Sequence, residues 1–125
     1  MVIWQDLYKK NRPLEKQADL NRLYRCGAAI GMFHVNPYGQ LQPCLIVRHI
    51  VFDLVKGTIA EGLTLLRQRL AALEAPENFV CDSCSQRTIC RNCPAFSYLE
   101  TGIEQRPSDF HCQVTRARAQ TLVQQ

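Results

Sequence analysis

The segment MFHVNPYGQLQPC at residues 32–44 carries the strongest local structural signal in this chain of 125 residues. Apolar and polar residues alternate on both sides of a central NPYG turn. Pro37 fixes φ for the turn, and Gly39 tolerates a left-handed backbone. These features predict a β-hairpin. Because a hairpin returns the chain to its starting point, we expect Cys44 at its end to lie near Cys26.

Extended and helical patterns follow the hairpin. The β-branched and aromatic residues at 45–55 predict one or two short extended segments. Thr58 and Glu61 form a capping box, and apolar residues spaced by three and four predict a helix that ends near Leu73. We expect the apolar stripe of this helix to form core, and its members are Ile59, Leu63, Leu66, Leu70 and Leu73.

The remaining segments complete a two-part organisation. Residues 1–25 are predicted to form a helical arm or linker that is interrupted at Pro13. Residues 26–125 are predicted to form one small α+β domain, with cysteine-rich loops and turns before a terminal helix that begins at Cys112.

Composition excludes several classes of protein. The formal charge of +4 is spread along the chain, which provides no basic patch for nucleic acid. The N-terminus lacks the apolar segment of a secretory signal, and no run of about 18 apolar residues could span a bilayer. We therefore expect a cytoplasmic protein that does not bind membranes and whose thiols stay reduced and available as ligands.

Seven cysteines are the main functional feature. Four of them form the dense run CDSCSQRTICRNC at residues 81–93. An odd count without a secretory signal disfavours a disulfide framework. Thiolates packed this closely repel one another unless a cation shares them, so the run indicates a metal or iron–sulfur site. The full set is Cys26, Cys44, Cys81, Cys84, Cys90, Cys93 and Cys112.

The cysteine spacing favours iron–sulfur clusters over zinc. Zinc ribbons separate their two C-x2-C pairs by about 15–20 residues, whereas five residues separate Cys84 from Cys90. One zinc ion also takes four ligands, which leaves Cys26, Cys44 and Cys112 to be explained separately. Tight, uneven spacings with a remote last cysteine are typical of iron–sulfur proteins. A zinc-binding structural or protein-interaction module is the alternative.

The array resembles the SPASM domain, the auxiliary-cluster domain of many radical S-adenosylmethionine (SAM) enzymes, which include anaerobic sulfatase-maturating and peptide-modifying enzymes. The family pattern is C-x9–15-G-x4-C, a gap, C-x2-C-x5-C-x3-C, a second gap and a final cysteine. Here Cys26, Gly39 and Cys44 fit the first half, with twelve and then four intervening residues. The run at 81–93 fits the second half, except that two residues rather than three precede Cys93. Cys112 supplies the final cysteine.

The resemblance implies two [4Fe–4S] clusters. The first would be held by Cys81, Cys84, Cys90 and Cys112. The second would be held by Cys26, Cys44 and Cys93, with a fourth iron open to water, substrate, a residue from elsewhere or a non-thiolate side chain. The candidate side chains for that position are His34, Asp82 and His111.

The resemblance also implies that a different domain or protein generates the radical. The radical-generating cluster of this superfamily uses C-x3-C-x2-C, and no such spacing occurs here. We therefore expect a chain that does not bind SAM and is not catalytic alone, either a stand-alone domain or a C-terminal fragment. Its expected role is electron transfer and substrate docking for a radical SAM core that modifies a peptide or protein. A ferredoxin-like electron carrier is a further alternative.

Overall fold

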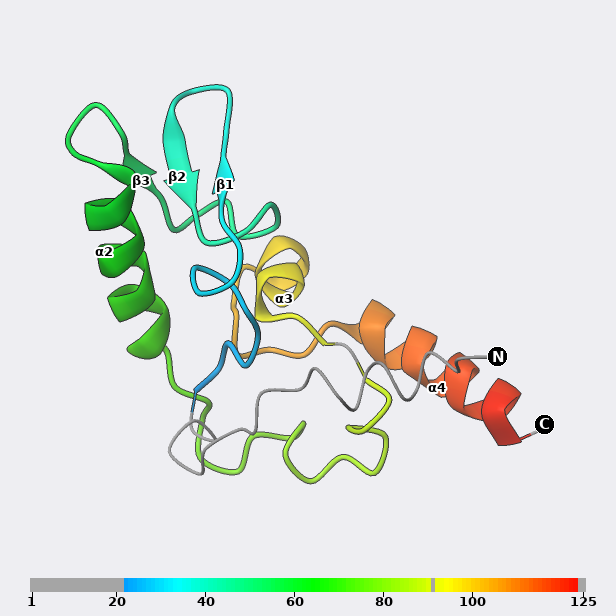
Figure 1. The fold of residues 1–125 in the computed structure, drawn as a ribbon. Coiled ribbons are helices and arrows are strands. Elements are labelled where there is room, and N and C mark those ends of the chain that lie inside the picture. The colour runs from blue at the N-terminus through cyan, green and yellow to red at the C-terminus, as the bar shows by residue number, and fades with distance from the viewer. Residues whose placement is uncertain (1–21, 91, 124–125) are drawn as a thin grey trace, which may run out of the picture.

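A three-stranded antiparallel sheet and three helices form the regular structure of residues 22–90 and 92–123, the residues described by this computed structural model. The predicted α+β class is confirmed (Figure 1). Residues 1–21 of the predicted arm lie outside the described residues. The elements are β1 (His34–Val35), β2 (Gln40–Gln42), β3 (Phe52–Asp53), α2 (Ile59–Ala71), α3 (Pro94–Thr101) and α4 (Asp109–Val123).

Strands β1 and β2 form the predicted hairpin and pair in antiparallel register. The side-chain oxygen Oδ1 of Asn36 accepts hydrogen bonds from the backbone N–H groups of Tyr38 at 3.0 Å and Gln40 at 3.1 Å. Gly39 has a φ of 73°, which is the left-handed conformation that the turn requires. The turn chemistry therefore fixes where the chain reverses direction.

A third strand, β3, joins the free edge of β2, so that Leu41 is the partner of Phe52 in the ladder. The backbone N–H of Leu54 also donates to the carbonyl of Gly39 at 3.1 Å. The extended structure predicted at 45–55 is confirmed for β3, whereas residues 43–51 are irregular. The sheet consequently has three strands rather than the two of an isolated hairpin.

Helix α2 begins where the capping box predicts. The backbone N–H of Glu61 donates to Thr58 Oγ1 at 3.3 Å, and the backbone N–H of Thr58 donates to Glu61 Oε2 at 2.8 Å. The bonds from the Thr58 backbone and side chain lower the pKa of Glu61, because they stabilise its carboxylate. The helix ends at Ala71, slightly before the predicted end near Leu73.

Helix α2 packs against the sheet through its buried face. Leu66 is fully buried, and most of the predicted stripe lies in or against the core. A Cβ at Gly62 would lie 2.6 Å from the ring of Phe52 and 2.7 Å from Leu41 Cδ2, so the helix contacts the sheet where it has no side chain. Ile59 is an exception to the predicted stripe, because it is 43% exposed at the first turn.

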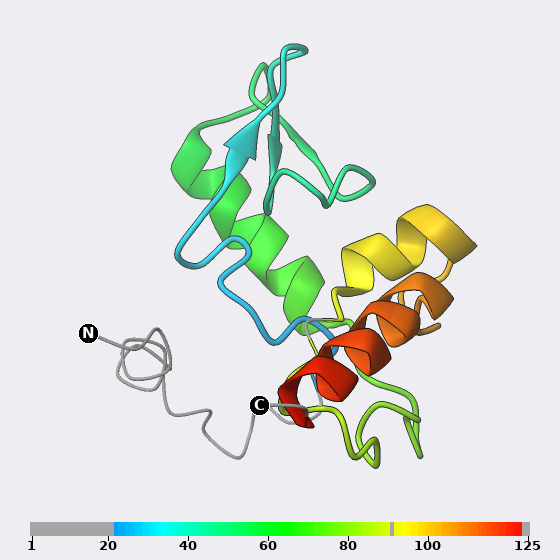
Figure 2. The ribbon, with the colours of Figure 1, turned by 90° about the vertical axis from the view of Figure 1, so that its right-hand side faces the viewer.

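Helices α3 and α4 lie next to each other (Figure 2). The ring centroids of Phe96 on α3 and His111 on α4 are 5.0 Å apart. The sequence prediction assigned no helix to α3, and it placed the start of the terminal helix at Cys112 rather than at Asp109. Ser108 Oγ accepts the backbone N–H of His111 at 3.2 Å, which stabilises this earlier start.

No helix within residues 22–90 and 92–123 combines the length and apolar character that a bilayer crossing requires.

The capping box of α2 makes a testable contribution to stability. Thr58→Ala should lower the free energy of unfolding by about 1 kcal/mol, because the N–H of Glu61 loses its acceptor. Thr64→Ala is the matched control, since Thr64 is an exposed residue in the middle of the same helix. It should change the stability by less than about 0.5 kcal/mol. Denaturation followed by circular dichroism measures both, and equal losses would contradict the capping role.

Candidate metal centre

The segment 77–90 is a loop of successive turns that lies beside α4 (Figures 1 and 2). Its backbone bonds include Asp82 N–H to Phe79 O at 2.8 Å and Cys90 N–H to Gln86 O at 2.9 Å. The predicted loops and short turns are therefore confirmed for this part of the chain. Such turns keep cysteines that are three to six residues apart within one short loop.

Four cysteines of the candidate site influence one another, and we call them the four-thiol group: Cys81, Cys84, Cys90 and Cys112. The pKa of Cys81 is raised to about 11, first by burial and then by the nearby Cys112, Cys90, Cys84 and Asp82. Cys112 belongs to the first turn of α4, where its N–H donates to Ser108 O at 3.1 Å. The loop therefore contributes Cys81, Cys84 and Cys90 to the four-thiol group, and the first turn of α4 contributes Cys112.

The surroundings of the four-thiol group supply hydrogen-bond donors and positive charge. Thr115, which is only 3% exposed, donates from Oγ1 to Cys90 Sγ at 3.3 Å. Arg25 donates to Asp82 Oδ1 at 3.2 Å, and Arg87 contacts the same oxygen. Two guanidinium groups therefore converge on one carboxylate next to Cys81 in the sequence.

The other three cysteines are also linked by electrostatic influence, and we call them the three-thiol group: Cys26, Cys44 and Cys93. Burial raises the pKa of Cys26, a hydrogen bond from the Ala28 backbone lowers it, and the nearby Cys93 and Cys44 raise it again. Cys26 reaches the surface, yet enough protein surrounds its sulfur to disfavour the thiolate. The effect of Cys44 on Cys26 indicates that the two thiols are near each other, as expected from the hairpin between them.

Two backbone features hold the three-thiol group together. The N–H of Ala29 donates to the carbonyl of Pro43 at 2.8 Å, which ties the segment after Cys26 to the end of the hairpin. Cys93 is the N-cap residue of α3 and is followed by Pro94 at the first helical position. Cys44 and Cys93 both pack against the hydrophobic core, and the thiol of Cys93 acts on Cys26.

The sequence did not predict a partly buried polar network that lies near Cys93 and Cys44. Tyr24 donates from Oη to Glu104 Oε1 at 2.7 Å, and His49 Nε2 lies 2.8 Å from the same oxygen. The His49 ring stacks on Tyr98 with centroids 3.6 Å apart. Burial, the bond to Glu104, the charge of Glu104 and the thiols of Cys93 and Cys44 all raise the pKa of Tyr24. No sequence motif links these residues, which come from four separate segments.

The structure places the candidate fourth ligands in different surroundings. Asp82, one of the three candidates, acts on Cys81 of the four-thiol group and is engaged by Arg25 and Arg87. His111 contacts Phe96 and Phe110, and its Nδ1 lies 3.3 Å from Ser108 Oγ. His34 belongs to β1. Arg91, next to Cys90, lies outside the described residues.

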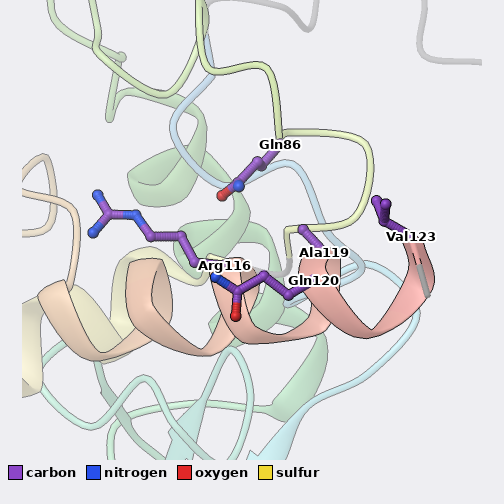
Figure 3. A pocket seen from close by; sticks show the side chains of 5 residues that line it. All are labelled: Gln86, Arg116, Ala119, Gln120 and Val123. Atoms are coloured by element: carbon purple, nitrogen blue, oxygen red, sulfur yellow. The ribbon is translucent and has the colours of Figure 1, made fainter.

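A shallow pocket lies between the cysteine loop and the outer part of α4 (Figure 3). Its volume is about 440 Å³, and Gln86 extends into it from the loop. The residues that line it are Gln86, Arg116, Ala119, Gln120 and Val123. None of these is a cysteine, so the pocket is separate from both thiol groups.

Neither thiol group is compact enough to enclose a single ion. Among the described residues, no three or more His, Cys, Asp or Glu side chains converge in a way that could hold one metal ion. Comparison of the chain with family models, curated proteins and solved structures finds no match. The function of the site must therefore be inferred from its candidate ligands, which are the four-thiol group and the three-thiol group.

Proposed function

We propose that this chain binds two [4Fe–4S] clusters and acts in the cytoplasm as the auxiliary-cluster domain of a radical SAM enzyme that modifies a peptide or protein. The observation that supports this proposal is the division of the seven cysteines into groups of four and three. These are the same two sets that the resemblance to SPASM domains implies. The crossing of Cys93 to the hairpin cysteines is the most specific part of this agreement, because a division by chain order would group it with Cys90.

The chemistry of the donor sets fits such clusters. Burial and mutual repulsion disfavour the thiolate at Cys81 and Cys26, so these groups lack a partner that would share negative charge. The iron ions of a bound cluster would supply positive charge that stabilises the thiolates, and the thiol protons would be released on binding. The thiolates that hold a four-iron cube stand farther apart than the ligands of one zinc ion, which suits the loose grouping of these cysteines. When bound, such clusters supply one-electron transfer.

The two groups suggest different roles. The four-thiol group would hold every iron of its cluster and would serve electron transfer. The three-thiol group would leave one iron without a cysteine ligand, and this position would accept a donor atom from the substrate or from solvent. The network of Tyr24, Glu104 and His49 lies near Cys93 and Cys44, which act on Tyr24, and it would support one side of that site.

Without a C-x3-C-x2-C motif, the chain would work beside a radical SAM core that supplies the radical. The proposed task of its clusters is to take up the electron that remains after substrate oxidation. The test is a reversible redox cycle of the protein purified without oxygen. Dithionite should bleach its visible absorption and produce two distinct electron paramagnetic resonance signals, and re-oxidation should restore the spectrum. Clusters that lose their iron in one cycle would support a structural role instead.

A further inference from the structure

Thr115 differs from other helical threonines in the direction of its hydroxyl. Thr64, Thr101 and Thr121 each donate to the backbone carbonyl four residues earlier, at 3.0, 2.8 and 3.1 Å. Such back-bonding is the usual local solution for a threonine in a helix. Thr115 instead donates to Cys90 Sγ at 3.3 Å, across 25 residues of sequence. Its hydroxyl is therefore used for a contact with sulfur between two separate segments.

The position of Thr115 couples it to the four-thiol group in a second way. Thr115 is three residues after Cys112 on α4, and residues at this spacing share one face of a helix. The same helix face thus contributes a candidate ligand and a hydrogen-bond donor to one group. Thr115 is 3% exposed, so water does not compete strongly for its hydroxyl.

A hydrogen bond to a cysteine sulfur has a predictable electrical effect. The bond strengthens as the sulfur gains negative charge, because a charged acceptor binds a donor more strongly than a neutral one does. Reduction of an iron–sulfur cluster places an extra negative charge on the cluster and its thiolates. A donor to sulfur therefore stabilises the reduced state more than the oxidised state and raises the reduction potential.

We infer that Thr115 is a positioning residue that raises the reduction potential of the cluster held by Cys81, Cys84, Cys90 and Cys112. This inference rests on the proposed function and adds the residue that tunes one of the two clusters. The effect acts through Cys90, so the cluster held by the three-thiol group should not respond to changes at Thr115.

The experiment compares three variants of the full chain, each loaded with iron and sulfide without oxygen. Thr115→Val keeps the side-chain shape and removes the donor, whereas Thr115→Ser keeps the donor. Thr121→Val makes the same change on the same helix, where the hydroxyl bonds a carbonyl instead of a sulfur. Redox titration followed by electron paramagnetic resonance gives the midpoint potential of each cluster.

Thr115→Val should make reduction of one cluster about tenfold less favourable, which corresponds to about 59 mV for a one-electron couple. The other cluster should keep its potential, and Thr115→Ser and Thr121→Val should match the wild type. Equal potentials in Thr115→Val and wild type at equal iron content would overturn the inference and leave the proposed function intact. A wild-type chain that takes up no iron and sulfide would overturn both.

A second measurement covers the case in which Thr115→Val does not fold. The reduced wild-type protein should show a strongly coupled exchangeable proton near one cluster by electron–nuclear double resonance, and D₂O should remove that coupling. Thr115→Ser should retain it. A wild-type cluster that lacks any such exchangeable proton would contradict the inference without the valine variant.

Discussion

Cys93→Ala should halve the iron content of the chain while one cluster remains intact. The thiols that act on Cys26 are Cys93 and Cys44, whereas those that act on Cys81 are Cys112, Cys90 and Cys84. Loss of this thiol leaves two cysteines in the three-thiol group, which are too few to hold a cube. The variant should therefore retain about four irons of about eight. Iron and sulfide analysis of the anaerobic protein measures this directly.

Cys90→Ala is the matched control for this experiment. It removes a thiol only three residues away, but from the other group. Cys90→Ala still leaves three thiols in the four-thiol group, the number that the other cluster is proposed to use, so it should retain more iron than Cys93→Ala. The electron paramagnetic resonance signal that it alters should be the one that Cys93→Ala keeps. If both variants alter the same signal, the division into four and three is wrong. If Cys93→Ala keeps all of its iron, Cys93 is not a ligand.

Leu41→Ala should produce the largest loss of stability among core substitutions in the hairpin. Leu41 is fully buried, and its Cδ2 lies against α2 at Gly62. Truncation to alanine leaves a cavity between the sheet and the helix, which should cost about 2–5 kcal/mol in the free energy of unfolding. Because β2 leads directly to Cys44, we also expect weaker iron retention by the three-thiol group.

Leu45→Ala is the control for the loss of a leucine side chain. Leu45 follows Cys44 and is 57% exposed, so its truncation should change stability by less than about 0.5 kcal/mol. Chemical denaturation of the iron-loaded chain, followed by far-ultraviolet circular dichroism, compares the two variants. Similar unfolding midpoints for both would contradict the packing of Leu41 between the sheet and α2.

The elements that could be predicted from sequence are those specified by local chemistry. The hairpin follows from the turn residues Pro37 and Gly39, and the start of α2 follows from the capping box of Thr58 and Glu61. In each case the residues that determine the element lie within a few positions of one another. The exposed position of Ile59 was not predicted, because the helical spacing alone does not say how far the packed stripe extends.

Helix α3 was missed although the sequence carried signals for it. Pro94 stands at the first helical position, and Gly102 ends the helix with a φ of 75°. This arrangement of proline and glycine is typical of helix boundaries. The short length of α3 and its place beside the cysteine run directed the prediction towards a loop.

Contacts between distant segments could not be predicted, because no local pattern encodes them. The pairing of β3 with β2 depends on how the irregular residues 43–51 return to the sheet. Glu104 meets Tyr24 across 80 residues and His49 across 55 residues. The bond from Thr115 to Cys90 belongs to the same class. The cysteine spacing indicated a thiol-rich site, while the division into two groups came first from the resemblance.

The most direct test is the metal content of the wild-type chain, purified without oxygen. The proposal that two clusters occupy the two thiol groups predicts about eight irons and about eight acid-labile sulfides per chain, with negligible zinc. Stoichiometric zinc without sulfide would contradict it and would identify a zinc-binding module instead.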